Sequence, residues 1–169
     1  MKWLFAESCR EKLKQEEDEV KNKDKKESKN NNKEKIFDSH REHIIIVVDR
    51  ENISKDADIE RLEKHITNIS NILHSSQNES DRNIQLTTIK IAGYCSTVKK
   101  DVDIVVRSNR KDAVDHYISY YVGKLESSVK NIKKIYVVTR DNFAGCLQDF
   151  CNIIQHVADV DDLMDMLKV

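Results

Sequence analysis

The sequence predicts an α/β domain in which a central, mainly parallel sheet of four or five strands is flanked by helices in a three-layer arrangement. From His43 onward, short runs rich in Ile and Val alternate with segments of helical periodicity. The preceding part of the chain is different, because residues 11–35 carry 17 charges in 25 positions and only two aliphatic side chains. We therefore expect a charged N-terminal extension over residues 1–42 and one domain over residues 43–169.

The expected strands are β-branched runs with few polar interruptions. They cover residues 44–48, 86–91, 102–106 and 135–139, with a weaker fifth strand near residues 157–158. Near-continuous runs of Ile and Val are typical of strands that are buried on both faces, as in a parallel sheet.

The expected helices repeat apolar residues at steps of three and four. These sets lie within residues 57–74, 114–125, 143–154 and 163–167. Strands and helices alternate along most of the domain, which predicts right-handed crossovers wherever a helix joins parallel neighbours. Residues 2–20 can form a further, charged helix, which would dock onto the domain, form a homo-oligomer or bind another molecule.

Composition excludes several classes of protein. The chain has 29 basic and 30 acidic residues, which argues against a polybasic nucleic-acid binder, although a local basic patch is compatible with this balance. The longest apolar run, Ile44–Val48, is too short to cross a membrane, and the apolar N-terminal patch ends at Ala6, too early for a secretory signal. We therefore expect a cytoplasmic protein. None of the three glycines belongs to a GxGxxG or GxxxxGK loop, so no nucleotide cofactor is expected.

Acidic residues follow three of the expected strands. Asp49 follows the first strand, Asp112 and Asp115 follow the third, and Asp141 follows the fourth. The carboxyl ends of parallel strands meet at one edge of a sheet, so these side chains converge if the strands are neighbours. Clustered carboxylates repel one another, and a divalent cation such as Mg²⁺ or Mn²⁺ would relieve that repulsion.

Each acid also has a structural interpretation. Asp112 or Asp141 could cap the helix that follows it. Asp115 lies too far into its helix to act as a cap and stands beside the apolar position Val114. Three such positions at three strand ends favour a site.

Three segments together resemble the PIN-like/NYN nuclease domain. They are VVDRENI at 47–53, NRKDAVDHYISYYVGKL at 109–125 and IYVVTRDNFAGCL at 135–147. The resemblance implies a metal-dependent ribonuclease with Asp49, Asp115 and Asp141 at the positions of the metal-binding, catalytic acids. It also implies that Asn52 and Thr139 shape the site. Asp112 stands where this branch often has Asn and would add a fourth carboxylate.

The leading hypothesis is therefore metal-dependent hydrolysis of RNA phosphodiester bonds, with one or two Mg²⁺ or Mn²⁺ ions activating water. Basic residues adjoining the acids could bind the RNA backbone, or could equally be solvated surface: Arg50, Arg107, Arg110, Lys111 and Arg140. Tyr117 and Tyr120 could stack on bases, whereas Tyr121 is in register with the predicted core.

Two other interpretations remain open at this point. A catalytically degenerate PIN-like domain could serve as an interaction or self-assembly module, using the N-terminal helix. A phosphoryl-accepting, receiver-like domain is less well supported, because it requires a paired acid after the first strand and a Lys after a late strand.

Overall fold

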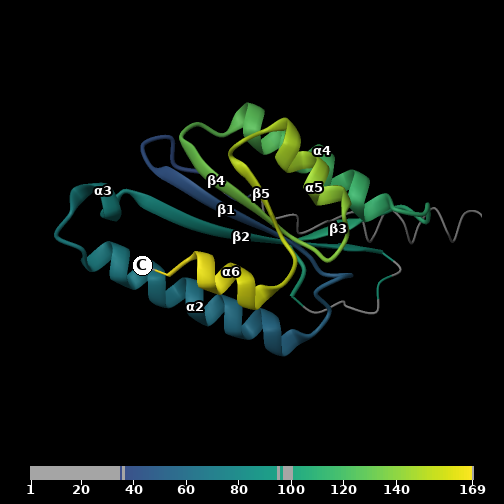
Figure 1. The fold of residues 1–169 in the computed structure, drawn as a ribbon, viewed down its shortest axis with the longest axis horizontal. Coiled ribbons are helices and arrows are strands. Elements are labelled where there is room, and N and C mark those ends of the chain that lie inside the picture. The colour runs from purple at the N-terminus through teal and green to yellow at the C-terminus, as the bar shows by residue number, and fades with distance from the viewer. Residues whose placement is uncertain (1–34, 36, 95, 97–100, 169) are drawn as a thin grey trace, which may run out of the picture. The chain divides into compact units, whose positions relative to one another are not determined.

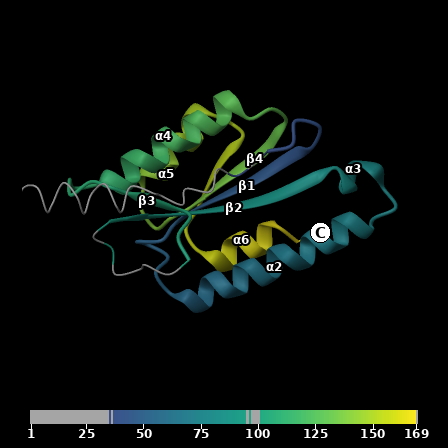
Figure 2. The same ribbon diagram turned by 180° about the vertical axis from the view of Figure 1, so that it is seen from behind.

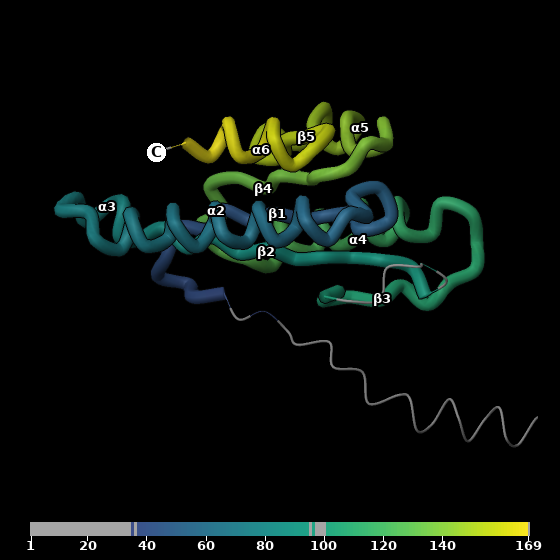
Figure 3. The backbone as a smooth tube through the Cα atoms, turned by 90° about the horizontal axis from the view of Figure 1, so that it is seen from below, coloured from purple at the N-terminus to yellow at the C-terminus, as the bar shows by residue number. Residues whose placement is uncertain are grey.

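The computed structural model of the chain describes residues 35, 37–94, 96 and 101–168, which belong to one compact unit. Its centre is a five-stranded, all-parallel sheet with the strand order β3-β2-β1-β4-β5 (Figures 1 and 3). The strands are β1 (Glu42–Asp49), β2 (Ile84–Gly93), β3 (Ile104–Val106), β4 (Ile132–Val138) and β5 (Ile154–Val157). The predicted parallel α/β fold is confirmed.

Helices cover both faces of the sheet, which gives three layers (Figures 1 and 2). The helices are α2 (Asp56–Ser75), α3 (Glu79–Arg82), α4 (Ala113–Ser128), α5 (Phe143–Phe150) and α6 (Val160–Met166). Helices α4 and α5 pack on one face, whereas α2 and α6 pack on the other. The short helix α3 was not predicted.

Strand β1 lies at the middle of the sheet and is buried on both sides. Ile45 and Val47 contribute to the core under α4 and α5, while Ile46 and Val48 contribute to the core under α2 and α6. All four side chains are fully buried. The uninterrupted apolar run in the sequence therefore has a direct cause, since neither face of this strand meets water.

The strand order places a topological switch point between β1 and β4. From β1 the chain builds outward through β2 and β3, then crosses through α4 to β4 on the other side of β1. In open parallel sheets, a crevice forms beyond the carboxyl ends of the strands at such a point, and ligands bind there. The topology thus marks the ends of β1 and β4 as the place for a site.

The predicted third helix and fifth strand need correction. Ile154 was assigned to the helix, but α5 ends at Phe150, and Ile154 begins β5 by pairing with Ile135 of β4. The backbone of Cys151 is already extended, with φ −146°. Phe150 fits the helical spacing, yet it is 87% exposed. Apolar residues spaced three and four apart therefore continue from helix α5 into strand β5, although the helix ends between them.

The compact unit also includes part of the predicted extension. Phe37 packs against the core under α4 and α5, and the Lys35 Nζ lies 3.1 Å from the Asp103 Oδ1. The predicted helix over residues 2–20 and its proposed role in a homo-oligomer lie outside the described residues. Among the described helices, none has the length and apolarity needed to cross a membrane.

Candidate metal centre

Three carboxylates meet at the switch point. Asp49 ends β1, Asp141 follows β4, and Asp115 lies in the first turn of α4, which packs above β1 and β2. Each of the three offers an oxygen that lies within 4.8 Å of the oxygens offered by the other two. The convergence predicted from the sequence is therefore present for these three acids, which come from three separate elements.

Asp49 is fully buried and its carboxylate is held by four hydrogen bonds. The Asp49 Oδ1 accepts from the backbone N–H of Glu51 at 3.0 Å and from that of Asn52 at 3.4 Å. The Asp49 Oδ2 accepts from the Asn52 Nδ2 at 2.7 Å and from the Thr139 Oγ1 at 2.9 Å. Because a buried carboxylate is costly without partners, these bonds fix both its position and its orientation.

Asn52 and Thr139 also join the two strand ends. The Asn52 Nδ2 donates to the Asp141 Oδ2 at 2.7 Å as well as to Asp49. The Thr139 Oγ1 accepts from the backbone N–H of Asp141 at 3.2 Å, and the Thr139 carbonyl lies 2.9 Å from the His156 Nε2. Sequence reasoning selected Asn52 and Thr139 but missed His156, which reaches this site only through the pairing of β4 with β5.

Among the three clustered acids, Asp115 has a carboxyl whose pKa is clearly raised. Desolvation, followed by the negative charges of Asp49 and Asp141, raises the pKa of its carboxyl from 3.8 to about 6. The charges of Asp112 and Glu51 also raise this pKa, with smaller effects. A cation held among these oxygens would remove the repulsion that raises this pKa.

Asp112 lies outside the close group of three. It occupies the N-cap position of α4 in a left-handed conformation, with φ 57° and ψ 21°, and its side chain makes no capping hydrogen bond. Its carboxylate is exposed. Asp112 therefore contributes negative charge beside the cluster, and the capping role considered from the sequence is not observed for it.

Glu51 is an acid near the cluster that sequence reasoning did not assign to the site. Its Oε1 accepts from the backbone N–H of Gly93, at the end of β2, at 3.2 Å. A Cβ at position 93 would stand 2.6 Å from that oxygen, so a larger residue there would displace the Glu51 carboxylate from this position. The scarcity of glycine in the chain was the available signal, because Gly93 follows a strand that neighbours the one carrying Asp49.

Arg50 does not belong to the predicted basic rim. Its side chain is fully buried, with the Nη1 donating to the Ile53 carbonyl and the Nη2 to the Asp56 Oδ1, both at 2.6 Å. A guanidinium in this position cannot reach an RNA phosphate. Arg50 instead fastens the loop between β1 and α2, the loop that carries Asn52.

The other four predicted cations are exposed around the strand ends. Arg107, Arg110 and Lys111 follow β3, and Arg140 follows β4. Arg110 also borders a cavity of about 200 Å³ beside the cluster, lined by Glu51, Gly93, Ser108, Asn109, Arg110, Asp112, Ala113 and Val114. Positive side chains and an open cavity thus adjoin the carboxylates.

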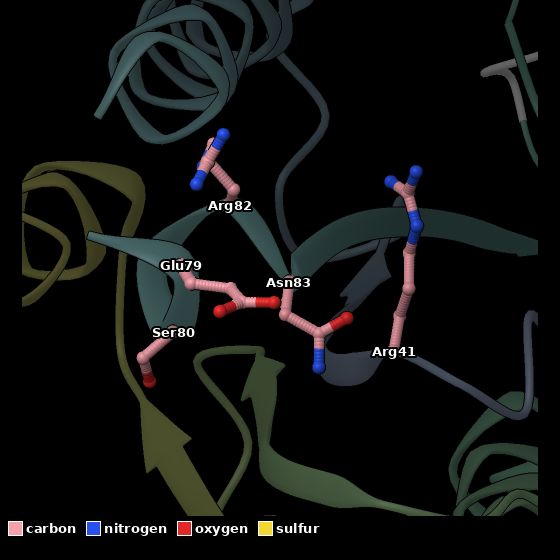
Figure 4. Close-up of a pocket in the computed structure, with 5 residues that line it drawn as sticks. All are labelled: Arg41, Glu79, Ser80, Arg82 and Asn83. Carbon is pink, nitrogen blue, oxygen red and sulfur yellow. The ribbon is translucent and has the colours of Figure 1, made fainter. Parts of the chain in front are cut away.

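A second, larger cavity of about 600 Å³ lies elsewhere (Figure 4). It is lined by Arg41, Glu79, Ser80, Arg82 and Asn83. Arg41 and Asn83 directly precede β1 and β2, so this cavity lies at the amino ends of the strands. It is therefore separated from the carboxylate cluster by the length of the sheet.

Fold and site together define a parallel α/β domain with a cluster of three aspartates, at its switch point, that is compatible with metal binding. Comparisons of the chain with protein-family profiles, with curated proteins and with solved structures found no match.

Proposed function

We propose that the chain is a metal-dependent endoribonuclease built on the plan of the PIN-like/NYN nucleases that it resembles. The observation that carries this proposal is the close approach of Asp49, Asp115 and Asp141 at the switch point. Exposed cations beside the cluster provide the complementary charge that a phosphodiester substrate requires.

The donor set suits Mg²⁺ or Mn²⁺. All three close donors are carboxylate oxygens, which hard divalent cations prefer, whereas a zinc site would favour His or Cys. Asp115 and Asp141 are partly or fully exposed, so they can change rotamer to complete a coordination sphere. Asp49 cannot move in this way, and it would serve as the fixed ligand.

Different side chains would have different roles in hydrolysis. When bound, the cation would supply an activated water and neutralise charge on the phosphate. Asn52 and Thr139 keep the Asp49 carboxylate facing Asp141. Arg110, Lys111 and Arg140 would bind phosphates on either side of the scissile bond. No side chain has to act as a nucleophile, since water attacks the phosphorus.

The test is Mn²⁺-dependent cleavage of single-stranded and structured RNA by the purified full chain. Asp49→Asn and Asp141→Asn should each lower the rate at least about a hundredfold, because each removes a charge from the metal site. Asp149→Asn is the matched control, since Asp149 is exposed on α5 and does not belong to the close group of three acids. Circular dichroism should show native secondary structure in all three variants.

Two results would contradict the proposal: cleavage that survives both substitutions, and cleavage that EDTA does not abolish. A folded wild-type chain that binds no Mn²⁺ and cleaves no RNA would favour the interaction module instead.

A further inference from the structure

The outer flank of α4 carries an aromatic strip that begins at the cavity beside the carboxylates. Ala113 lines that cavity, and Tyr117 and Tyr120 follow it at steps of four and three residues, which places all three on one side of the helix. The Tyr117 and Tyr120 ring centroids are 6.2 Å apart. Tyr117 also stacks on Tyr121 at 6.1 Å, with an angle of 13° between the rings.

Packing explains only part of this strip. Val114, Ile118 and Val122 form the buried face of α4, and Tyr117 and Tyr121 pack against the edge of the same core. Tyr120 is 65% exposed, although it adjoins the other rings. The two partly buried rings therefore support an aromatic surface that faces solvent at Tyr120.

Exposed cations lie at both ends of the strip, and at the cavity end the acids Glu51 and Asp112 lie beside them. Arg110 and Lys111 precede α4 and are exposed beside the cavity, while Lys124 is exposed one helical turn beyond Tyr120. The distance along the helix from Ala113 to Tyr120 is about 10 Å at a rise of 1.5 Å per residue. An aromatic ring between cations suits a flexible polyanion with flat, stackable groups.

We propose that this strip of α4 binds the single-stranded RNA on one side of the cleavage site, with a base stacked on Tyr120 and phosphates near Arg110, Lys111 and Lys124. The assignment of a cleavage site rests on the proposed function, but the binding surface does not require the metal. Stacking tolerates any base, so the strip should bind single strands with little sequence preference.

The test is fluorescence anisotropy with a short, labelled single-stranded RNA, measured on the full chain in EDTA so that no cleavage occurs. Tyr120→Ala should weaken binding about tenfold, whereas Tyr120→Phe, which keeps the ring, should stay within about twofold of wild type. Phe150→Ala is the control for a general loss of exposed aromatic surface, because Phe150 is 87% exposed at the far end of α5. It should leave the affinity unchanged.

Equal affinities of wild type and Tyr120→Ala would overturn the inference, as would a wild-type chain that binds no RNA. Loss of affinity in Tyr120→Phe as large as in Tyr120→Ala would also overturn it, since stacking would not be the cause. A wild-type chain that never cleaves, but binds RNA through Tyr120, would support the strip while contradicting the nuclease.

Discussion

Asp49 shows how a buried acidic side chain is stabilised at the end of the central strand of an apolar sheet. It ends the most buried strand, and every hydrogen bond to its carboxylate comes from a residue that follows β1 or β4. Both carboxylate oxygens are therefore satisfied by donors from the loops rather than by a cation from the protein. These bonds hold the carboxylate close to those of Asp141 and Asp115, an arrangement that is compatible with a shared metal ion.

Asp115 should make the stability of the metal-free protein depend on pH. Its pKa is about 6 in the folded chain and near 3.8 when unfolded, so the folded state binds more protons between those values. Folding stability from this group should therefore fall as the pH rises from about 4 to about 6, and then level off. Urea unfolding in EDTA across that range should show a shallower fall for Asp115→Asn.

The control for this prediction is Asp149→Asn, which should keep the wild-type slope because it lies outside the cluster. Identical pH profiles for wild type and Asp115→Asn would show that folding does not raise the pKa of Asp115.

At the scale of elements, the loop between β1 and α2 shows that a sequence motif does not tell where each of its side chains lies. Four consecutive residues, 49–52, adjoin the site in sequence, yet their side chains point to different places. Asp49 and Asn52 form the cluster, Glu51 reaches toward Gly93, and Arg50 turns into the interior. Sequence adjacency to an acid therefore did not determine whether a basic side chain is exposed beside the cluster.

Arg50 should act on stability, whereas Arg140 should act on RNA binding. Arg50→Ala leaves the Ile53 carbonyl without its partner and opens a buried space, so it should lower the free energy of unfolding by about 2–4 kcal/mol. Arg140→Ala should change that free energy by less than about 0.5 kcal/mol, since Arg140 is exposed. Urea denaturation measures both values.

The same two variants separate the roles in an RNA-binding assay. Arg140→Ala should weaken binding and reduce its salt dependence, because a phosphate contact is lost. Arg50→Ala should retain wild-type affinity under conditions where it is fully folded. Matching stabilities of the two variants would contradict the structural role of Arg50.

Boundaries between elements were the part that periodicity predicted least well. The buried strands β1 and β4 were readable because their apolar runs are continuous, whereas β5 has only Ile154 and Val157 buried. Ile154 also fits the helical spacing of the preceding segment, and only its pairing with Ile135 decides its state. Short, half-exposed elements depend on tertiary contacts that a local pattern does not contain.

At the scale of the whole molecule, the order of strands in the sheet brings residues from separate sequence motifs together in one site. The sequence indicated which residues end strands, but the convergence of Asp49 and Asp141 requires β4 to lie directly beside β1. Long-range pairing of this kind is set by the packing of helices on both faces rather than by any local signal. The contribution of Asp115 likewise depends on where α4 packs above the sheet. The candidate acids were thus readable from the sequence, whereas their geometry came from the fold.

The fold shows where the acidic and basic residues behind the net charge are placed. A formal net charge of −1 gives no preference for nucleic acid. In the folded unit, acids gather at the switch point, while exposed cations lie beside them after β3 and β4. A bound divalent cation would make this edge of the sheet more positive than the total suggests. If the proposed binding of RNA is correct, it should therefore depend on how the charges are distributed rather than on the net charge.

A metal ion at this position would join β1, β4 and α4, so its binding should stabilise the entire unit. Mn²⁺ at a hundred times its dissociation constant should add about 2.7 kcal/mol to the free energy of unfolding, which corresponds to a rise in Tm on the order of 10 °C. Differential scanning fluorimetry with Mn²⁺, Mg²⁺ and EDTA measures this shift. Asp49→Asn should remove most of this shift, whereas Asp149→Asn should retain it, because Asp49 belongs to the close group of three acids and Asp149 does not. A Tm that is unchanged at millimolar Mn²⁺, or a shift of equal size in Asp49→Asn, would place metal binding elsewhere or nowhere on the chain.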